Sequence, residues 1–309
     1  MSKIKLTKRS VIIASAFVVL VFVISLFYVN AKKDAAFPAL EKIAQQGDAA
    51  AQFNLGFMYS RGEGVKQDSQ KAVYWYEKAA EQGDAQAQFY LGLMYLIGEG
   101  VKQDSQKAVY WYEKAAAHGL SQAQFNLGLM YDEGEGVKQD SQKAFYWYEK
   151  AADQGVARAQ FYLGRMYDEG EGVKQDSQKA FYWFEKAAEQ GDAQAQFYLG
   201  LMYTGVNYDH EKAFYWYEKA AQQGHAQAQF NLGLMYDDIR EGVKQDSQKA
   251  VYWFEKAAEQ GDVVAQFNLG LMYSDGRGVK QDSQKAFYWI KKVADQGSEE
   301  AQKFLNEHF

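Results

Sequence analysis

The segment Asp48–Gly83 reads DAAAQFNLGFMYSRGEGVKQDSQKAVYWYEKAAEQG, and it is the first of seven closely similar copies that follow one another in the chain of 309 residues. Each copy has the motif A-Q-F-[NY]-L-G-x-M-Y, a loop, and the motif K-A-[VF]-Y-W. A fixed period in this range predicts one supersecondary unit stacked on copies of itself, with a long open surface in place of an enclosed pocket. The copies are Asp48–Gly83, Asp84–Gly119, Leu120–Gly155, Val156–Gly191, Asp192–Gly224, His225–Gly261 and Asp262–Gly297.

The first half of each copy has the spacing of an amphipathic helix. In the first copy Ala51, Leu55, Gly56 and Tyr59 recur at helical intervals, and they mark a buried stripe. Gly56 costs about 1 kcal/mol relative to Ala inside a helix. A glycine at this place in every copy therefore predicts that another helix approaches so closely that a side chain would clash.

The second half of each copy predicts a second helix. The loop Gly62–Val65 breaks the first helix because its glycines permit positive φ. Asp68 or Ser69 is expected to cap the next helix, which ends at Gly83. Its apolar stripe comprises Ala72, Trp75, Tyr76, Ala79 and Ala80. Each copy holds one Trp, and burying it contributes at most about 5 kcal/mol, so Trp is predicted to be a packing element.

These motifs resemble the Sel-one-like repeat (SLR) family, a branch of the tetratricopeptide-like superfamily. The resemblance covers Asp48–Gly297 and rests on A-x3-L-G-x2-Y, G-x-G-V, K-A-x2-W and K-A-A followed by G. Gln52 stands where the tetratricopeptide pattern has Trp, and the loop is longer, which favours the SLR branch. The resemblance implies a right-handed α/α superhelix that acts as a protein-binding adaptor, often in bacterial envelopes.

The predicted fold is all-α: a right-handed α/α superhelical solenoid of seven two-helix repeats over residues 37–309, preceded by an N-terminal hydrophobic helix. Half-repeats are expected at each end. Ala39–Gly47 matches the second half of a repeat, and Ser298–Phe309 matches the first half with polar substitutions such as Lys303 and Asn306. A polar outer face is what a terminal repeat requires.

Residues 1–36 form a separate leader and tether. Four cationic residues, Lys3, Lys5, Lys8 and Arg9, precede the uncharged segment Val11–Val29, whose 19 residues span about 28 Å as a helix. The segment is either a signal anchor that stays in the membrane or a signal peptide cleaved after Ala31. Both alternatives place the repeats outside the cytoplasm, on the periplasmic side.

Composition and motifs argue against several function classes. The net charge of −6 without a basic run disfavours nucleic-acid binding. The chain has no cysteine, its four histidines are scattered in register, and its one S-x-x-K lies at Ser2–Lys5 inside the leader. We therefore expect no cofactor, no metal and no enzymatic activity. Two alternatives remain open: an envelope hydrolase, since some cysteine-rich relatives have been described as β-lactamases, and a secreted factor that binds host proteins.

A protein or peptide partner is the expected ligand. If the first helices line the concave face, as in the related superfamily, one column of side chains offers amide and phenol groups to an extended backbone. We call this column the first-helix row; it consists of Asn54, Tyr90, Asn126, Tyr162, Tyr198, Asn231 and Asn268. Arg165 lies beside it and is a candidate anchor for a carboxylate. The alternative is a solvated row that binds nothing.

A second column lies on the other helix of each repeat. We call it the second-helix ladder; it consists of Tyr74, Tyr110, Tyr146, Tyr182, Tyr215, Tyr252 and Tyr288, each followed four residues later by Lys. Tyr74 faces away from the direction of Ala72. The ladder is either an interaction stripe or a set of rings that cover the junctions between repeats while their hydroxyls reach water.

Overall fold

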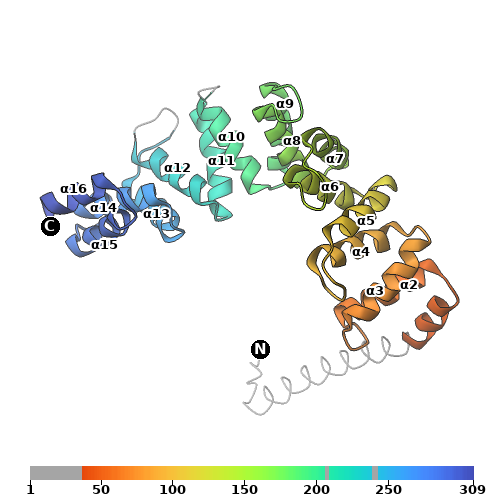
Figure 1. Cartoon of the computed structure of the whole chain (residues 1–309). Helices are drawn as coiled ribbons and strands as arrows, with labels where there is room; N and C mark the ends of the chain where they lie inside the picture. Colours follow the sequence, from red (N-terminus) through yellow and green to blue (C-terminus); the bar gives the residue numbers. More distant parts are fainter. Residues whose placement is uncertain (1–36, 206–208, 239–242) are drawn as a thin grey trace, which may run out of the picture. The chain divides into compact units, whose positions relative to one another are not determined.

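The computed structural model of the chain describes residues 37–205, 209–238 and 243–309, and these residues form helices joined by short loops, without a β-strand (Figure 1). The predicted hydrophobic helix Val11–Val29 and the cleavage position Ala31 lie outside the described residues. Within the described ranges, none of the helices has both the length and the apolar character needed to span a membrane.

Each repeat consists of two helices, as the two motifs predict. The first helices are α2 (Ala49–Arg61), α4 (Ala85–Ile97), α6 (Ser121–Glu133), α8 (Ala157–Glu169), α10 (Ala193–Gly205), α12 (Ala226–Asp237) and α14 (Val263–Asp275). The second helices are α3 (Ser69–Glu81), α5 (Ser105–Ala117), α7 (Ser141–Asp153), α9 (Ser177–Glu189), α11 (His210–Gln222), α13 (Ser247–Glu259) and α15 (Ser283–Ala294). A helix over residues 37–45 precedes α2, and α16 (Glu299–His308) follows the last repeat.

The chain divides into two compact units, with the boundary between Trp147 and Tyr148 inside α7. In both units a first helix packs against the second helix of its repeat, and that second helix packs against the next first helix. Helices α2, α3 and α4 show the pattern in the first unit, and α8, α9 and α10 show it in the second. The handedness of the superhelix stays a prediction.

The glycine inside the first helix is the contact point for a large side chain of the second helix, an aromatic ring at Gly56, Gly92, Gly164, Gly200 and Gly233 and the side chain of Ile290 at Gly270. A Cβ on Gly56 would lie 2.7 Å from Cδ1 of Tyr76 and 3.2 Å from the carbonyl oxygen of Ala72. The predicted close approach is therefore confirmed, and the helices meet because glycine leaves room for the ring.

The side chain that packs against this glycine belongs to the residue that follows the tryptophan of the same repeat. This residue is buried in every repeat, whereas each Trp is only partly buried; both were predicted to lie in the apolar stripe, and the residue after the Trp takes the more central place. In the second unit Trp216, Trp253 and Trp289 pack against the edge of the core. The buried residues are Tyr76, Tyr112, Tyr148, Phe184, Tyr217, Phe254 and Ile290.

A buried glutamine connects consecutive repeats. Nε2 of Gln52 donates to the carbonyl of Ala44 at 3.0 Å, and Oε1 of Gln52 accepts from Nε2 of Gln82 at 2.6 Å. Buried polar groups need hydrogen-bond partners. Because both ends of its amide have one, Gln52 can be buried at the place where the related pattern has Trp. The equivalent buried residues are Gln88, Gln124, Gln160, Gln196, Gln229 and Gln266.

The loop and cap predictions are confirmed in the first repeat. Gly62 and Gly64 both have φ of 70°. Asp68 caps α3, since its carboxylate accepts from the amide N–H of Lys71 at 3.0 Å. Ser69, the other cap candidate, donates its hydroxyl to Glu99 of the next repeat at 2.7 Å. This segment therefore caps its own helix and contacts the following repeat, and Ser105 makes the same contact with Glu135.

Histidine replaces the usual aspartate at one N-cap. His225 caps α12, and its Nδ1 accepts from the N–H of Ala228 at 3.2 Å. Its ring stacks on Phe197 at 4.6 Å, and its Nε2 lies 3.2 Å from Oε1 of Gln194. Burial of the ring lowers the pKa of His225, and nearby Asp192 opposes part of that effect. The folded state therefore favours the neutral imidazole, which is the form that accepts at the cap.

We expect the second unit to lose stability on acidification through this residue. Because the pKa of His225 is lower in the folded state, its contribution is complete above the unfolded value of about 6.5 and is lost as the pH falls through the folded value. His225→Asp and His225→Asn both restore a side-chain acceptor that stays unprotonated. The difference between the melting temperatures at about pH 7.5 and about pH 5 should be smaller in both variants than in the wild type. If that difference is the same in the variants and the wild type, His225 does not make the stability depend on pH.

Candidate functional site

The first-helix row lies on the first helices, with one side chain in each repeat. Asn54 is exposed, and the other six side chains are partly buried. In the first unit, Phe53 and Phe57 of α2 contact Tyr90 of α4, with ring centroids 5.8 Å and 5.9 Å apart. Adjacent first helices therefore share a surface of aromatic rings and amides.

The tyrosines of the row also stack on buried rings of the preceding repeat. Tyr90 stacks on Tyr76 at 5.5 Å with an interplanar angle of 13°, and Tyr198 stacks on Phe184 at 5.2 Å. Tyr162 stacks on Tyr148 at 5.0 Å. One face of each ring therefore belongs to the fold, which sequence reasoning did not predict. The partial exposure that remains still leaves these residues able to contact a ligand.

Arg165 has a carboxylate partner on its own helix. Its Nη2 lies 3.0 Å from Oε2 of Glu169, and its Nε donates to Oε1 of the same residue at 3.2 Å. Both side chains are at least one third exposed, so the pair is solvated and contributes little to stability. A partner carboxylate at Arg165 would have to exchange with Glu169.

The second-helix ladder is the more exposed of the two columns. Its tyrosines are 48% to 57% exposed. The ring of Tyr74 meets the ring of Trp75 edge-on at 5.0 Å, and Nζ of Lys78 lies 5.8 Å from the ring centroid of Tyr74. Each ring thus covers the neighbouring tryptophan on one side and faces water on the other.

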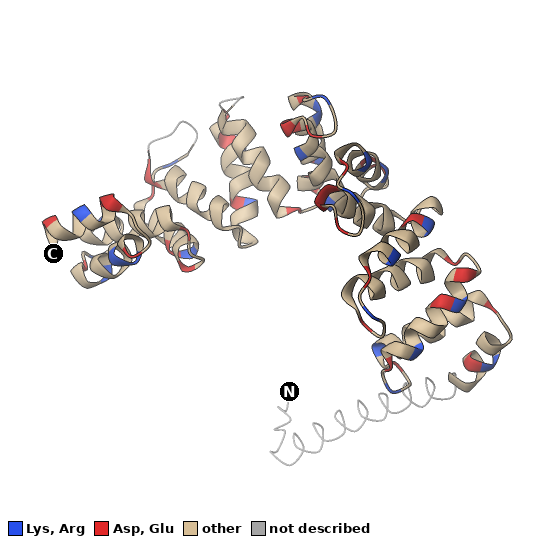
Figure 2. Ribbon diagram, viewed as in Figure 1, with Lys and Arg blue, Asp and Glu red and all other residues tan. Residues whose placement is uncertain are grey.

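Charges on the described helices are mixed in sign. Figure 2 shows Lys and Arg interspersed with Asp and Glu in both units. Among the described residues, no group of three or more His, Asp or Glu side chains is placed to hold a metal ion. What the repeats present to a ligand is a set of aromatic, amide and hydroxyl groups on helix surfaces.

Helix pairs packed in series, with their polar and aromatic side chains displayed on successive helices, define a helical repeat protein with a long exposed surface. The family model described as Sel1 repeat matches residues 49–84, 85–120, 121–156, 157–192, 193–225, 226–262 and 263–298. The chain therefore belongs to the Sel1 repeat family. Proteins of this family are in general protein-interaction scaffolds and are typically non-catalytic.

Two solved structures resemble the chain over most of its length. One is a protective antigen of uropathogenic Escherichia coli strains with an SLR fold; it is 36% identical with a TM-score of 0.73, over 89% of this chain and 67% of that chain. The other is a Sel1 repeat protein from Oxalobacter formigenes, which is 39% identical with a TM-score of 0.71, over 90% of this chain and 81% of that chain. The comparison with curated proteins found no match.

Proposed function

We propose that the chain is a non-enzymatic scaffold that binds a partner protein or peptide along the first-helix row. The observation that supports this proposal is the recurrence of a partly exposed Tyr or Asn on successive first helices. Tyrosine supplies contact area with a polar tip, and asparagine supplies both a donor and an acceptor. A regular series of these groups suits an extended backbone, which repeats its own donors and acceptors.

The ring stacking favours binding because it limits the motion of the free protein. Tyr90, Tyr162 and Tyr198 each rest on a buried ring of the preceding repeat. A side chain that is already held in place loses little rotamer freedom when a ligand arrives, so less of the interaction energy is lost to ordering.

The proposed partner is met outside the cytoplasm. The support is the leader, in which four cationic residues precede Val11–Val29. Fractionation of cells that express the whole chain, with sequencing of the mature N-terminus, separates the alternatives. A membrane-bound chain that keeps Val11–Val29 supports the anchor, and a start at Lys32 supports cleavage; a cytoplasmic full-length chain contradicts the proposed location.

A hydroxyl-deletion experiment tests the first-helix row. Tyr90→Phe, Tyr162→Phe and Tyr198→Phe together keep the ring stacks and remove three hydroxyls. Against extended peptides selected on the wild-type chain, we expect the triple variant to bind about tenfold or more weakly, because each lost hydrogen bond contributes about 0.5–1.5 kcal/mol. The melting temperature should change little, since the rings stay in place.

The matched control removes three hydroxyls from the second-helix ladder. Tyr74→Phe, Tyr146→Phe and Tyr182→Phe should leave the dissociation constant of the same peptides within about twofold, a difference of less than about 0.5 kcal/mol. If the ladder variant loses affinity while the row variant keeps it, the binding surface is the ladder and the proposal is wrong.

A further inference from the structure

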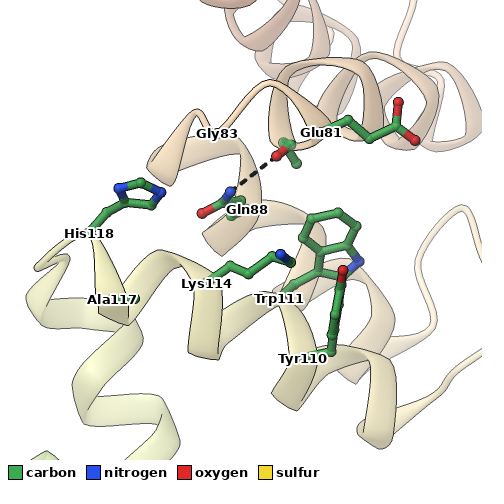
Figure 3. Close-up of a pocket in the computed structure, with 9 residues that line it drawn as sticks. Glu81, Gly83, Gln88, Tyr110, Trp111, Lys114, Ala117 and His118 are labelled. Carbon is green, nitrogen blue, oxygen red and sulfur yellow. Dashed lines mark hydrogen bonds between the residues drawn. The ribbon is translucent and has the colours of Figure 1, made fainter.

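A pocket of about 480 Å³ lies where α3, α4 and α5 meet in the first unit (Figure 3). Its lining includes Trp111, Tyr110 and Lys114 from α5 and Gln88 from α4. Trp111 is partly buried, and Tyr110 is half exposed, so the pocket has an aromatic wall that opens to solvent. A volume of this size accepts a side chain together with part of its backbone.

Gln88 is only 3% exposed and is one of the residues that line this pocket. Its Nε2 donates to the carbonyl of Ala80 at 3.1 Å, the bond drawn in Figure 3. Its Oε1 has no hydrogen-bond partner. Buried acceptors are nearly always satisfied, and each exception calls for an explanation.

The other repeats show which group satisfies the equivalent oxygen. Nε2 of Gln82 donates to Oε1 of Gln52 at 2.6 Å and to the carbonyl of Lys78 at 3.2 Å. The same arrangement recurs at Gln190, whose Nε2 donates to Oε1 of Gln160 at 2.7 Å and to the carbonyl of Lys186 at 3.5 Å. A primary carboxamide therefore fills this place, and its two N–H groups match the two acceptors.

One repeat lacks that carboxamide. The residues at the place of Gln82 in the later repeats are His118, Gln154, Gln190, Gln223, Gln260 and Gln296. In the same repeat Ala117 stands where Glu81 and its other equivalents carry polar side chains. His118 is exposed and lies on the opposite side of Gln88 from Trp111 (Figure 3). Two adjacent substitutions thus remove the glutamine side chain that supplies the donor in the other repeats.

We propose that this pocket binds the side-chain carboxamide of a glutamine or asparagine on a partner protein. On binding, which requires a small displacement of the side chains that cover Oε1 of Gln88, the carboxamide donates one N–H to that oxygen. It donates the other to the carbonyl of Lys114, which corresponds to the carbonyl of Lys78 and also accepts from the N–H of His118. Its aliphatic stem packs on the indole of Trp111 and on Ala117. A carboxylate has no proton to donate to Gln88, and the ammonium group of Lys114 at the rim disfavours a second cation. The site is separate from the first-helix row, so its test does not depend on that surface.

The test uses N-acetylglutamine N-methylamide as the probe and the indole N–H signal of Trp111, assigned with Trp111→Phe, as the NMR readout. We expect a saturable shift in the wild-type chain. His118→Gln restores the residue of the other repeats and fills the pocket from within. It should weaken probe binding at least tenfold and raise the melting temperature by about 2 °C, because Gln88 gains its donor.

The reciprocal variant opens an equivalent pocket in the second unit. Glu189→Ala with Gln190→His removes the donor from Gln160, so the indole signal of Trp183 should become sensitive to the probe and the melting temperature should fall by about 2 °C. The capped glutamate and capped lysine analogues of the probe should give no saturable shift at either site.

Three results would overturn the proposal. They are a wild-type chain that shows no saturable shift with the glutamine probe, a shift that persists in His118→Gln, and an equal or stronger response to the glutamate or lysine probe. Equal melting temperatures for wild type and His118→Gln would show that solvent already satisfies Gln88, and this result also counts against the proposal.

Discussion

Tyr112→Ala should lower the free energy of unfolding by about 3–5 kcal/mol, the range for deleting a large aromatic side chain from a core. Tyr112 is fully buried, and its ring lies against Gly92 and 5.7 Å from the ring of Phe89. The cavity left by the ring cannot be filled by collapse, because the helices on both sides are held by their own contacts. Urea denaturation followed by circular dichroism measures the loss.

Tyr112→Phe is the matched control, and it should be close to neutral. The hydroxyl of Tyr112 is buried without a hydrogen bond of good geometry, and burial raises the pKa of this residue to about 12, an effect that a weak interaction with Asn126 partly opposes. Removing an unsatisfied hydroxyl costs little or stabilises by about 0.5–1 kcal/mol. Phe184 and Phe254 occupy the same place in other repeats. A large loss in Tyr112→Phe would mean that the hydroxyl has a stabilising role that the geometry does not provide.

Gly92→Ala should destabilise the first unit by about 1–3 kcal/mol, although alanine favours a helix over glycine by about 1 kcal/mol. A Cβ at this position would lie 2.8 Å from Cδ1 of Tyr112 and 3.2 Å from the carbonyl oxygen of Ala108. The ring could tilt, but the carbonyl belongs to α5, so relief requires the two helices to separate. The same denaturation measurement gives the sign and size of the effect.

Two further variants test this explanation of the glycine. Gly205→Ala makes the same change at the end of α10, where nothing lies within 4 Å of the new Cβ, and it should stabilise by up to about 1 kcal/mol. In a double-mutant cycle, Gly92→Ala should cost less when Tyr112 is already Ala, because the clashing ring is absent. Equal effects of alanine at Gly92 and Gly205 would show that helix propensity, and not packing, decides both.

The periodic sequence was sufficient to predict the pairing of helices, a cap at Asp68 or Ser69 and the close helix contact at Gly56. These features depend on residues within one repeat, where spacing along the chain translates directly into a helix face or a turn. The first-helix row was predicted as a binding column on the concave face, with a solvated row as the alternative; its side chains lie on the first helices, where Asn54 is exposed and the others are partly buried. Its stacking on the previous repeat was missed, because no spacing within one repeat indicates it.

The pocket at Gln88 was also missed, although its signal is visible in the sequence. His118 is the one departure from glutamine at its position among the seven repeats. Its importance depends on the contact between Gln82 and Gln52, two residues that are 30 positions apart. Without that contact, a single histidine on a helix end is indistinguishable from neutral variation.

The sequence by itself determined the all-helical repeat architecture and the residues that start, stop and cap the helices, because these depend on local backbone geometry and on hydrophobic periodicity. Only the tertiary structure decided that the residue after the tryptophan packs against the glycine of the first helix. It also decided that Gln52 contacts the segments on both sides of it, through Ala44 and Gln82, and that Arg165 is paired with Glu169. Burial depth and hydrogen-bond partners are set by the position of the neighbouring helix, and periodicity specifies which face of a helix is apolar but not which atoms will meet it.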